Sequence, residues 1–155
     1  RQWFELASPD LSSDVIATAC QNGVPVINQM LDVLCDTYQM AAKDILLGGF
    51  SQGGMIALSA GLAYKQALGG IFCLSGGWLT PDQNILQKPD LPILLAHGAA
   101  DPVVPLAMME TSQAALVSKG FAPQLLIRPA MPHSIDEAVI DGLATFIARY
   151  SIEQS

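Results

Sequence analysis

The sequence predicts an α/β fold, in which helices cover both faces of a mostly parallel sheet. Short apolar runs bounded by glycine or proline alternate with longer segments of helical spacing, which is the pattern of parallel βα units. Hydrophobic residues make up 51% of the chain and charged residues only 14%, as expected where strands are buried on both faces. No repeat, linker or low-complexity tract divides the 155 residues, so we expect a single domain over 1–155.

The first half of the chain contains a long helical region, a strand and a second helix. A serine-capped helical region spans residues 12–42, and a Gly-Val-Pro at 23–25 is expected to interrupt or kink it. The apolar run DILLGGF at 44–50 predicts a buried strand. Residues 54–68 follow at helical spacing, so a strand and a helix are expected to meet at one sharp turn.

The second half of the chain continues the alternation of predicted strands and helices. Strands are expected at 69–77, 91–98 and 123–129, each bounded by glycine or proline. The helix at 105–120 begins at a proline and ends at a glycine, and an amphipathic helix follows at 135–150. Because crossovers separate the strands, the strands should be parallel and their carboxyl ends should share one edge of the sheet.

Charge and cysteine content exclude several classes of protein. The chain has a net charge of −7. This charge argues against binding to nucleic acids and anionic membranes, because both require basic patches on a protein. No apolar run approaches the roughly 20 residues of a membrane span. Cys20, Cys35 and Cys73 are odd in number and form no CxxC pair, so we expect reduced thiols and a cytoplasmic protein. The absence of HExxH and of Cys/His ligand clusters predicts neither a metal nor an organic cofactor.

The predicted strand and helix meet at Gly49-Phe50-Ser51-Gln52-Gly53, a G-x-S-x-G motif. Between a strand and a helix this motif predicts a nucleophile elbow, a turn so sharp that the serine backbone is strained. Small residues two before and two after the serine are expected to let the strand and the helix approach. A phosphate-binding turn is the alternative, because helix N-termini favour anions, but neither GxGxxG nor Gly-Lys-Ser/Thr accompanies it.

A nucleophilic serine needs a histidine base and an acid that orients the histidine. Behind a nucleophile elbow the usual order is Ser, acid, His, and of the two histidines only His133 follows a suitable acid. Asp101 comes directly after the strand predicted at 91–98. The acid should therefore emerge at the same sheet edge as Ser51, where ligands of open α/β sheets bind.

Three other titratable residues have structural interpretations. Asp136 and Asp141 are closer to His133 in sequence, but they are expected to cap or decorate the last helix. His97 ends a predicted strand and precedes the acid candidates, so it is expected to be a structural side chain.

With GFSQGG, HGAADPVVP and MPHSI in this order, the chain resembles the acyl-protein thioesterase and carboxylesterase family of α/β-hydrolases, the lysophospholipase-like group. WFEL at 3–6, SPDLSSD at 8–14 and LSGGWL at 74–79 extend the resemblance over essentially the whole chain. Glu5 is a local departure, because the family usually has Asp there. The resemblance implies an α/β-hydrolase fold, of which this chain covers about the C-terminal two-thirds.

The resemblance also implies roles for individual residues. Ser51 would be the nucleophile, Asp101 the acid and His133 the base, and the backbone N–H of Gln52 would be one oxyanion donor. The second donor would lie on a Leu-His-Gly loop that precedes this chain, so we expect a domain incomplete at its N-terminus and a second polypeptide that supplies the missing strands. Four residues would line an acyl groove: Leu6, Trp78, Leu79 and Met109.

Together these features imply a serine hydrolase that cleaves carboxylic esters or acyl thioesters through an acyl-enzyme. Expected substrates are small-molecule or lipid esters and thioesters with an apolar acyl group, and acylated proteins. Two alternatives stay open. One is a non-catalytic binding module on the same fold, and the other is a different acyl-transfer activity, such as peptidase or acyltransferase action, on the same three residues.

Overall fold

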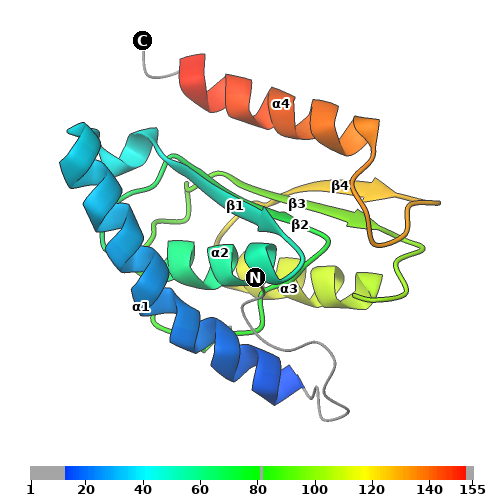
Figure 1. Cartoon of the computed structure of the whole chain (residues 1–155). Coiled ribbons are helices and arrows are strands. Elements are labelled where there is room, and N and C mark those ends of the chain that lie inside the picture. The colour runs from blue at the N-terminus through cyan, green and yellow to red at the C-terminus, as the bar shows by residue number, and fades with distance from the viewer. Residues whose placement is uncertain (1–12, 81, 153–155) are drawn as a thin grey trace.

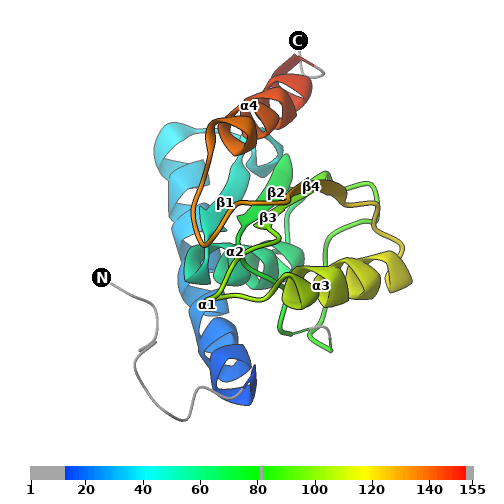
Figure 2. The same ribbon diagram turned by 90° about the vertical axis from the view of Figure 1, so that its right-hand side faces the viewer.

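The computed structural model describes residues 13–80 and 82–152. In chain order the elements are α1 (Ser13–Tyr38), the 3-10 helix η1 (Ala42–Asp44), β1 (Leu46–Phe50), α2 (Gln52–Ala63), β2 (Gly70–Leu74), β3 (Ile93–Gly98), α3 (Leu106–Ser118), β4 (Gln124–Arg128) and α4 (Glu137–Ile152). The four strands are parallel and lie in the order β1-β2-β3-β4. The helices α1, α2 and α3 lie on one side of the sheet and α4 on the other (Figure 1, Figure 2). The predicted parallel sheet with helices on both faces is confirmed.

Apolar strands form the centre of this sandwich. All six residues of β3 are buried, as a parallel strand covered on both faces should be. The main core lies between the sheet and the helices α1 to α3, and its largest fully buried side chains include Tyr64, Leu31, Ile56 and Leu95. A smaller cluster lies beneath α4 and contains Leu74, Ala96, Met131 and Val139. These two cores fix the carboxyl ends of the strands relative to one another.

The first helix differs from the prediction at residues 23–25 and at its C-terminal end, Tyr38. The structure has one helix from Ser13 to Tyr38 that contains Pro25, so an interruption at 23–25 is wrong, and the alternative of a kink stays a prediction. Packing explains why the helix continues, because α1 lies against α2 with Gly23 facing the side chain of Ile56. Beyond Tyr38 the positive φ of Gln39 ends the helix, and the N–H of Met40 bonds back to the Cys35 carbonyl, as in a Schellman motif.

The junction of β1 and α2 is a tight turn in which two glycines make close approaches. A Cβ added at Gly49 would lie 2.5 Å from the backbone carbon of Gly53, and one at Gly54 would lie 2.7 Å from the Cys73 sulfur. A Cβ at Gly53 would meet nothing within 4 Å. The expectation of a steric demand on both sides of the serine therefore holds for Gly49 but is wrong for Gly53, and Gly54 makes the second close approach.

This difference predicts opposite effects for two glycine substitutions. Gly49→Ala should lower the free energy of unfolding by about 1 to 3 kcal/mol or more, because its methyl group would overlap backbone atoms that cannot move aside. Gly53→Ala, the matched control, should be neutral or stabilising by up to about 1 kcal/mol, because it adds helix propensity in open space. Urea unfolding of both variants of the intact protein measures the difference. Equal destabilisation by both substitutions would contradict the steric explanation.

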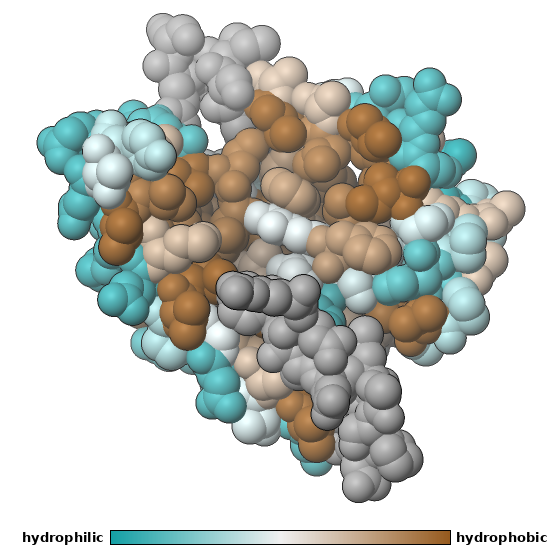
Figure 3. Space-filling model, in the orientation of Figure 1, coloured by the Kyte–Doolittle hydropathy of each residue, from teal (hydrophilic) through white to brown (hydrophobic). Residues whose placement is uncertain are grey.

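The strand β1 forms one edge of the described sheet, at the front of the view in Figure 1. Many apolar side chains are visible on this face (Figure 3). On α1 the exposed Val26, Met30 and Val33 follow one another at helical spacing, so they form a stripe. None of the helices in the described part of the chain combines the length and apolar character of a bilayer crossing.

Candidate active site

Ser51 occupies the turn between β1 and α2, at the carboxyl end of the sheet. Its backbone angles are φ 54° and ψ −121°, a region that residues other than glycine rarely occupy. Its N–H donates to the Leu74 carbonyl at 2.7 Å, and its own carbonyl accepts from Met55 at 3.0 Å. The strained turn is therefore held from both sides, by the neighbouring strand and by the first turn of the helix.

His133 from a distant loop contacts this serine, and Asp101 from another loop contacts His133. The Ser51 hydroxyl oxygen lies 3.0 Å from Nε2 of His133, and Nδ1 of His133 lies 2.7 Å from Oδ2 of Asp101. Asp101 follows β3 and His133 follows β4, so both come from the carboxyl ends of parallel strands. The contacts predicted from residue order are therefore present in the structure.

Both oxygens of the Asp101 carboxylate accept hydrogen bonds. Oδ2 accepts from the His133 ring, and Oδ1 accepts from the backbone N–H groups of Val103 and Val104 at 2.8 and 2.9 Å. Burial acts to raise the pKa of this carboxyl, but the hydrogen bonds from His133, Val104 and Val103 outweigh burial and hold the pKa below its ordinary value. Asp101 is thus a fixed carboxylate with one oxygen directed at the histidine.

The loop that carries His133 is anchored at both ends. On the N-terminal side of His133, the Met131 backbone passes so close to Gly98 that a Cβ added at Gly98 would overlap the Met131 carbonyl. On the C-terminal side, the guanidinium of Arg128 pairs with Asp136 at 2.9 Å, and Asp136 in turn accepts from the N–H of Val139 at the start of α4. The loop between β4 and α4 is therefore closed by an ion pair and by a helix cap.

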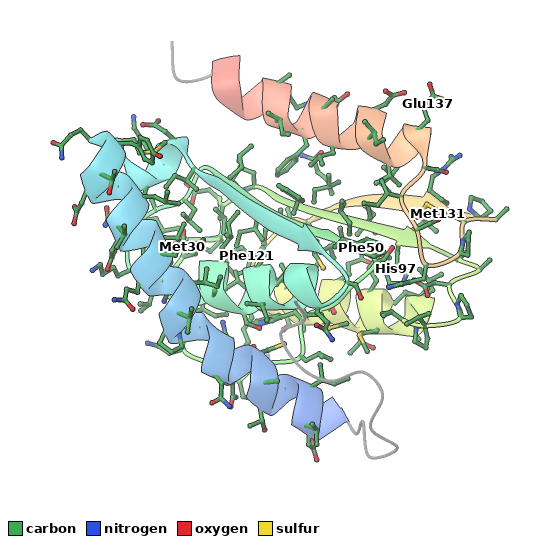
Figure 4. All side chains as sticks on the ribbon, in the orientation of Figure 1. Met30, Phe50, His97, Phe121, Met131 and Glu137 are labelled. Atoms are coloured by element: carbon green, nitrogen blue, oxygen red, sulfur yellow. The ribbon has the colours of Figure 1, made fainter. Side chains whose placement is uncertain are left out.

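Phe50, the residue before the serine, is a contact that sequence reasoning missed. Its ring centroid lies 4.7 Å from that of His133, with the two ring planes tilted by 45°. Figure 4 shows Phe50 and His97 near the carboxyl end of the sheet. The position of Phe50 inside G-x-S-x-G was the available signal, because its side chain must leave the strand beside the serine. Phe50 thus covers one side of the imidazole.

The proposed acyl-groove residues do not form one surface. Trp78 is 2% exposed, and its backbone N–H and indole N–H donate to Ser112 and Thr80, so it is an anchored core residue. Met109 is 1% exposed in the same core. Both side chains are covered by packing in this structure, and their place in an acyl groove stays a prediction. Leu79 is partly buried against this core, and Leu6 lies outside the described residues.

The three titratable residues that were expected to be structural lie outside the line of contacts from Ser51 through His133 to Asp101. Asp136 caps α4 as predicted, and the backbone carbonyl of the exposed Asp141 accepts from Thr145. His97 is fully buried at the end of β3, where Nε2 lies 2.9 Å from the Val104 carbonyl. Within residues 13–80 and 82–152 no cluster of His, Cys, Asp and Glu is suited to hold a metal ion.

Comparison with known proteins agrees with this geometry. The chain matches the model of the phospholipase/carboxylesterase family over residues 1–151. It is 35% identical to acyl-protein thioesterase 1 of Neurospora crassa over an alignment of 112 residues that covers 68% of this chain and 46% of that protein. It is 30% identical to acyl-protein thioesterase 1 of Kluyveromyces lactis over 112 residues, 67% of this chain and 48% of that protein. The chain thus spans about half the length of these curated relatives.

Solved structures show the same fold. The crystal structure of esterase PE8 superposes with a TM-score of 0.88 at 29% sequence identity and covers 96% of this chain, which corresponds to 70% of that protein. Arabidopsis thaliana SOBER1 superposes with a TM-score of 0.73 at 24% identity, over 97% of this chain and 70% of that one. These matches give no support to the expectation of a separate second polypeptide. With its parallel sheet, its strained serine turn and its match over residues 1–151, the chain belongs to the phospholipase/carboxylesterase family of α/β-hydrolases.

Proposed function

We propose that the intact protein is a serine hydrolase that cleaves carboxylic esters or acyl thioesters with an apolar acyl group. The observation that carries this proposal is the unbroken line of contacts from the strained Ser51 through His133 to Asp101, at 3.0 and 2.7 Å. The two buried cysteines, Cys20 and Cys73, are poor alternative nucleophiles. Burial raises the pKa of the Cys20 thiol to about 11 and that of the Cys73 thiol to about 12, so neither is a thiolate at neutral pH.

In the proposed mechanism the Ser51 oxygen attacks the acyl carbonyl carbon while Nε2 of His133 takes the hydroxyl proton. The carbon–oxygen or carbon–sulfur bond to the leaving group then breaks, and the same proton passes from His133 to the leaving alcohol or thiol. Water attacks the acyl-enzyme in the second half, again with His133 as the base, and the proton returns to Ser51. Asp101 holds the Nδ1–H tautomer and stabilises the imidazolium.

The negative charge that develops on the acyl oxygen needs backbone donors. Gln52 is the first residue of α2, so its N–H lies at the positive end of a helix, directly after the nucleophile. We assign it as one oxyanion donor and expect the second from a residue outside 13–80 and 82–152. Each such donor contributes on the order of 10² to 10³ in rate.

The substrate and the cellular location are part of the same proposal. Relatives named acyl-protein thioesterase suggest thioesters of acylated proteins, and the family name suggests carboxylic esters and phospholipids. The mechanism uses side chains and backbone donors alone, so we expect no cofactor. The three cysteines are free, and free thiols are typical of the cytoplasm.

Labelling with a fluorophosphonate probe tests the proposal together with ester turnover. The intact protein should react at one site, mapped to Ser51 by peptide mass spectrometry, and should hydrolyse p-nitrophenyl butyrate and a matched thioester. Ser118→Ala, which changes an exposed serine at the end of α3, is the matched control and should behave as the wild type. A protein that neither reacts nor turns over would be a binding module, and one that prefers peptide anilides to esters would be a peptidase.

A further inference from the structure

A second histidine lies against the acid of the proposed active site. His97 is the last residue but one of β3 and is 0% exposed. Its Nε2 is 2.9 Å from the carbonyl oxygen of Val104 and 3.6 Å from Oδ2 of Asp101, the oxygen that faces His133. Two imidazoles therefore lie near Oδ2 of Asp101, although only that of His133 is within hydrogen-bond distance.

The hydrogen bond fixes which nitrogen of His97 carries a proton. A carbonyl oxygen can only accept, so Nε2 of His97 must be the donor to Val104. The other ring nitrogen, Nδ1, is buried and has no hydrogen-bond partner in the described part of the chain. An apolar side chain of similar size would fill this position without an unpaired ring nitrogen but would leave the Val104 carbonyl without its donor, so packing alone does not explain a histidine here.

Val104 connects the two residues. Its carbonyl accepts from His97, and its N–H donates to Oδ1 of Asp101 at 2.9 Å. One peptide segment is thus clamped between the end of β3 and the carboxylate. If His97 releases the carbonyl, the turn that orients Oδ1 loosens, and Oδ2 is no longer fixed at 2.7 Å from His133.

We propose that His97 is a positioning residue for the ester hydrolysis, which holds the Asp101 turn through Val104 so that the carboxylate stays aligned with His133. The inference rests on the function proposed above. His97 touches neither Ser51 nor the position of the acyl carbon, so its effect should appear in the orientation of the acid. The titratable side chains that lie against Asp101 are those of His97 and His133, and the Arg128–Asp136 pair closes the loop that carries His133.

Three substitutions separate positioning from packing. His97→Gln places an amide N–H near the position of Nε2 and should keep kcat within about threefold of the wild type. His97→Leu keeps the bulk without a donor, and His97→Asn keeps an amide that is too short to reach Val104. Both should lower kcat for p-nitrophenyl butyrate by about 10- to 100-fold, with KM nearly unchanged, because a buried carbonyl loses its donor.

The pH profile of kcat/KM provides a readout that a merely structural role would not move. With Asp101 misaligned, the imidazolium of His133 loses stabilisation, so the acid limb should move to lower pH in the Leu and Asn variants and stay in place in the Gln variant. Each rate is divided by the concentration of active sites, which is measured by titration with fluorophosphonate. Unfolded protein therefore does not affect the comparison. In the proton NMR spectrum, the downfield Nδ1–H resonance of His133 should weaken or shift in the same two variants.

Each outcome decides the proposal. Lower kcat with a shifted acid limb in the Leu and Asn variants, reversed in the Gln variant, supports it. An unshifted acid limb at unchanged kcat per active site overturns it, as does a Gln variant as impaired as the Leu variant. A wild-type protein that hydrolyses neither esters nor thioesters would instead refute the proposed function. The NMR comparison would still show whether His97 orders the acid.

Discussion

Ser51→Ala should reduce turnover of p-nitrophenyl butyrate by about 10⁴- to 10⁶-fold, because removal of the nucleophile leaves only oxyanion stabilisation and substrate binding. The substitution keeps the hydrogen bonds of the turn, which come from the backbone N–H and carbonyl of this residue. The free energy of unfolding should therefore change by no more than about 0.5 kcal/mol. Steady-state kinetics and urea unfolding of the same preparation measure both quantities.

Ser51→Gly is the matched variant that tests the strain at the elbow. It should be as inactive as Ser51→Ala, but it should be more stable than the alanine variant by about 1 kcal/mol or more, because φ 54° with ψ −121° is accessible to glycine without steric cost. Equal stability of the two variants would show that the turn stores no strain. Loss of folding in both would show that the serine is structural, and would remove the basis for assigning it as a nucleophile.

The carboxyl edge of the sheet could be predicted from the sequence because several local signals agree there. Glycine and proline bound β2, β3 and β4, apolar runs mark buried strands, and parallel strands bring their following loops to one edge. Ser51, Asp101 and His133 each follow such a strand. The family identified from motif order is the one that the comparison shows.

The features that could not be predicted from the sequence depend on contacts between elements that are distant in sequence. Pro25 signals a break, yet the contact of Gly23 with α2 keeps α1 continuous. Trp78 was predicted to face a ligand, and its two hydrogen bonds in the core are contacts that the sequence did not indicate. His97 was expected to be structural, and its relation to Asp101 becomes visible only once the turn to Val104 is seen. Pairings of this kind leave no periodic signal in a sequence.

Acid should destabilise the protein in part through Asp101. The folded state holds the pKa of this carboxyl below its ordinary value of about 3.9, so ionised Asp101 contributes stability at pH values above that value. The contribution is lost as the pH falls below about 4 towards the lower pKa of the folded state. Asp101→Asn cannot titrate, so its unfolding free energy should fall less steeply with pH in this window. Urea unfolding between pH 3 and pH 7 compares the two proteins.

Asp101→Asn should also lower kcat at neutral pH by about 10⁴-fold, because it should impose the wrong tautomer on His133. The N–H groups of Val103 and Val104 both donate to Oδ1, so the amide oxygen of asparagine must take that position. Its NH2 group then faces Nδ1 of His133, where the carboxylate oxygen had been. An amide NH2 can only donate, so Nδ1 becomes the acceptor and the ring proton moves to Nε2.

With the proton on Nε2, His133 can no longer accept the proton of Ser51, although all three side chains stay in place. Asp101→Ala is the informative partner, because it leaves the imidazole free to choose either tautomer and should retain at least as much activity as Asp101→Asn. Nitrogen-15 NMR of the imidazole distinguishes the tautomers directly. If Asp101→Asn keeps the Nδ1–H form, or if it exceeds Asp101→Ala in kcat, then the backbone donors of the turn do not dictate the amide orientation, and the role assigned to Val103 and Val104 is wrong.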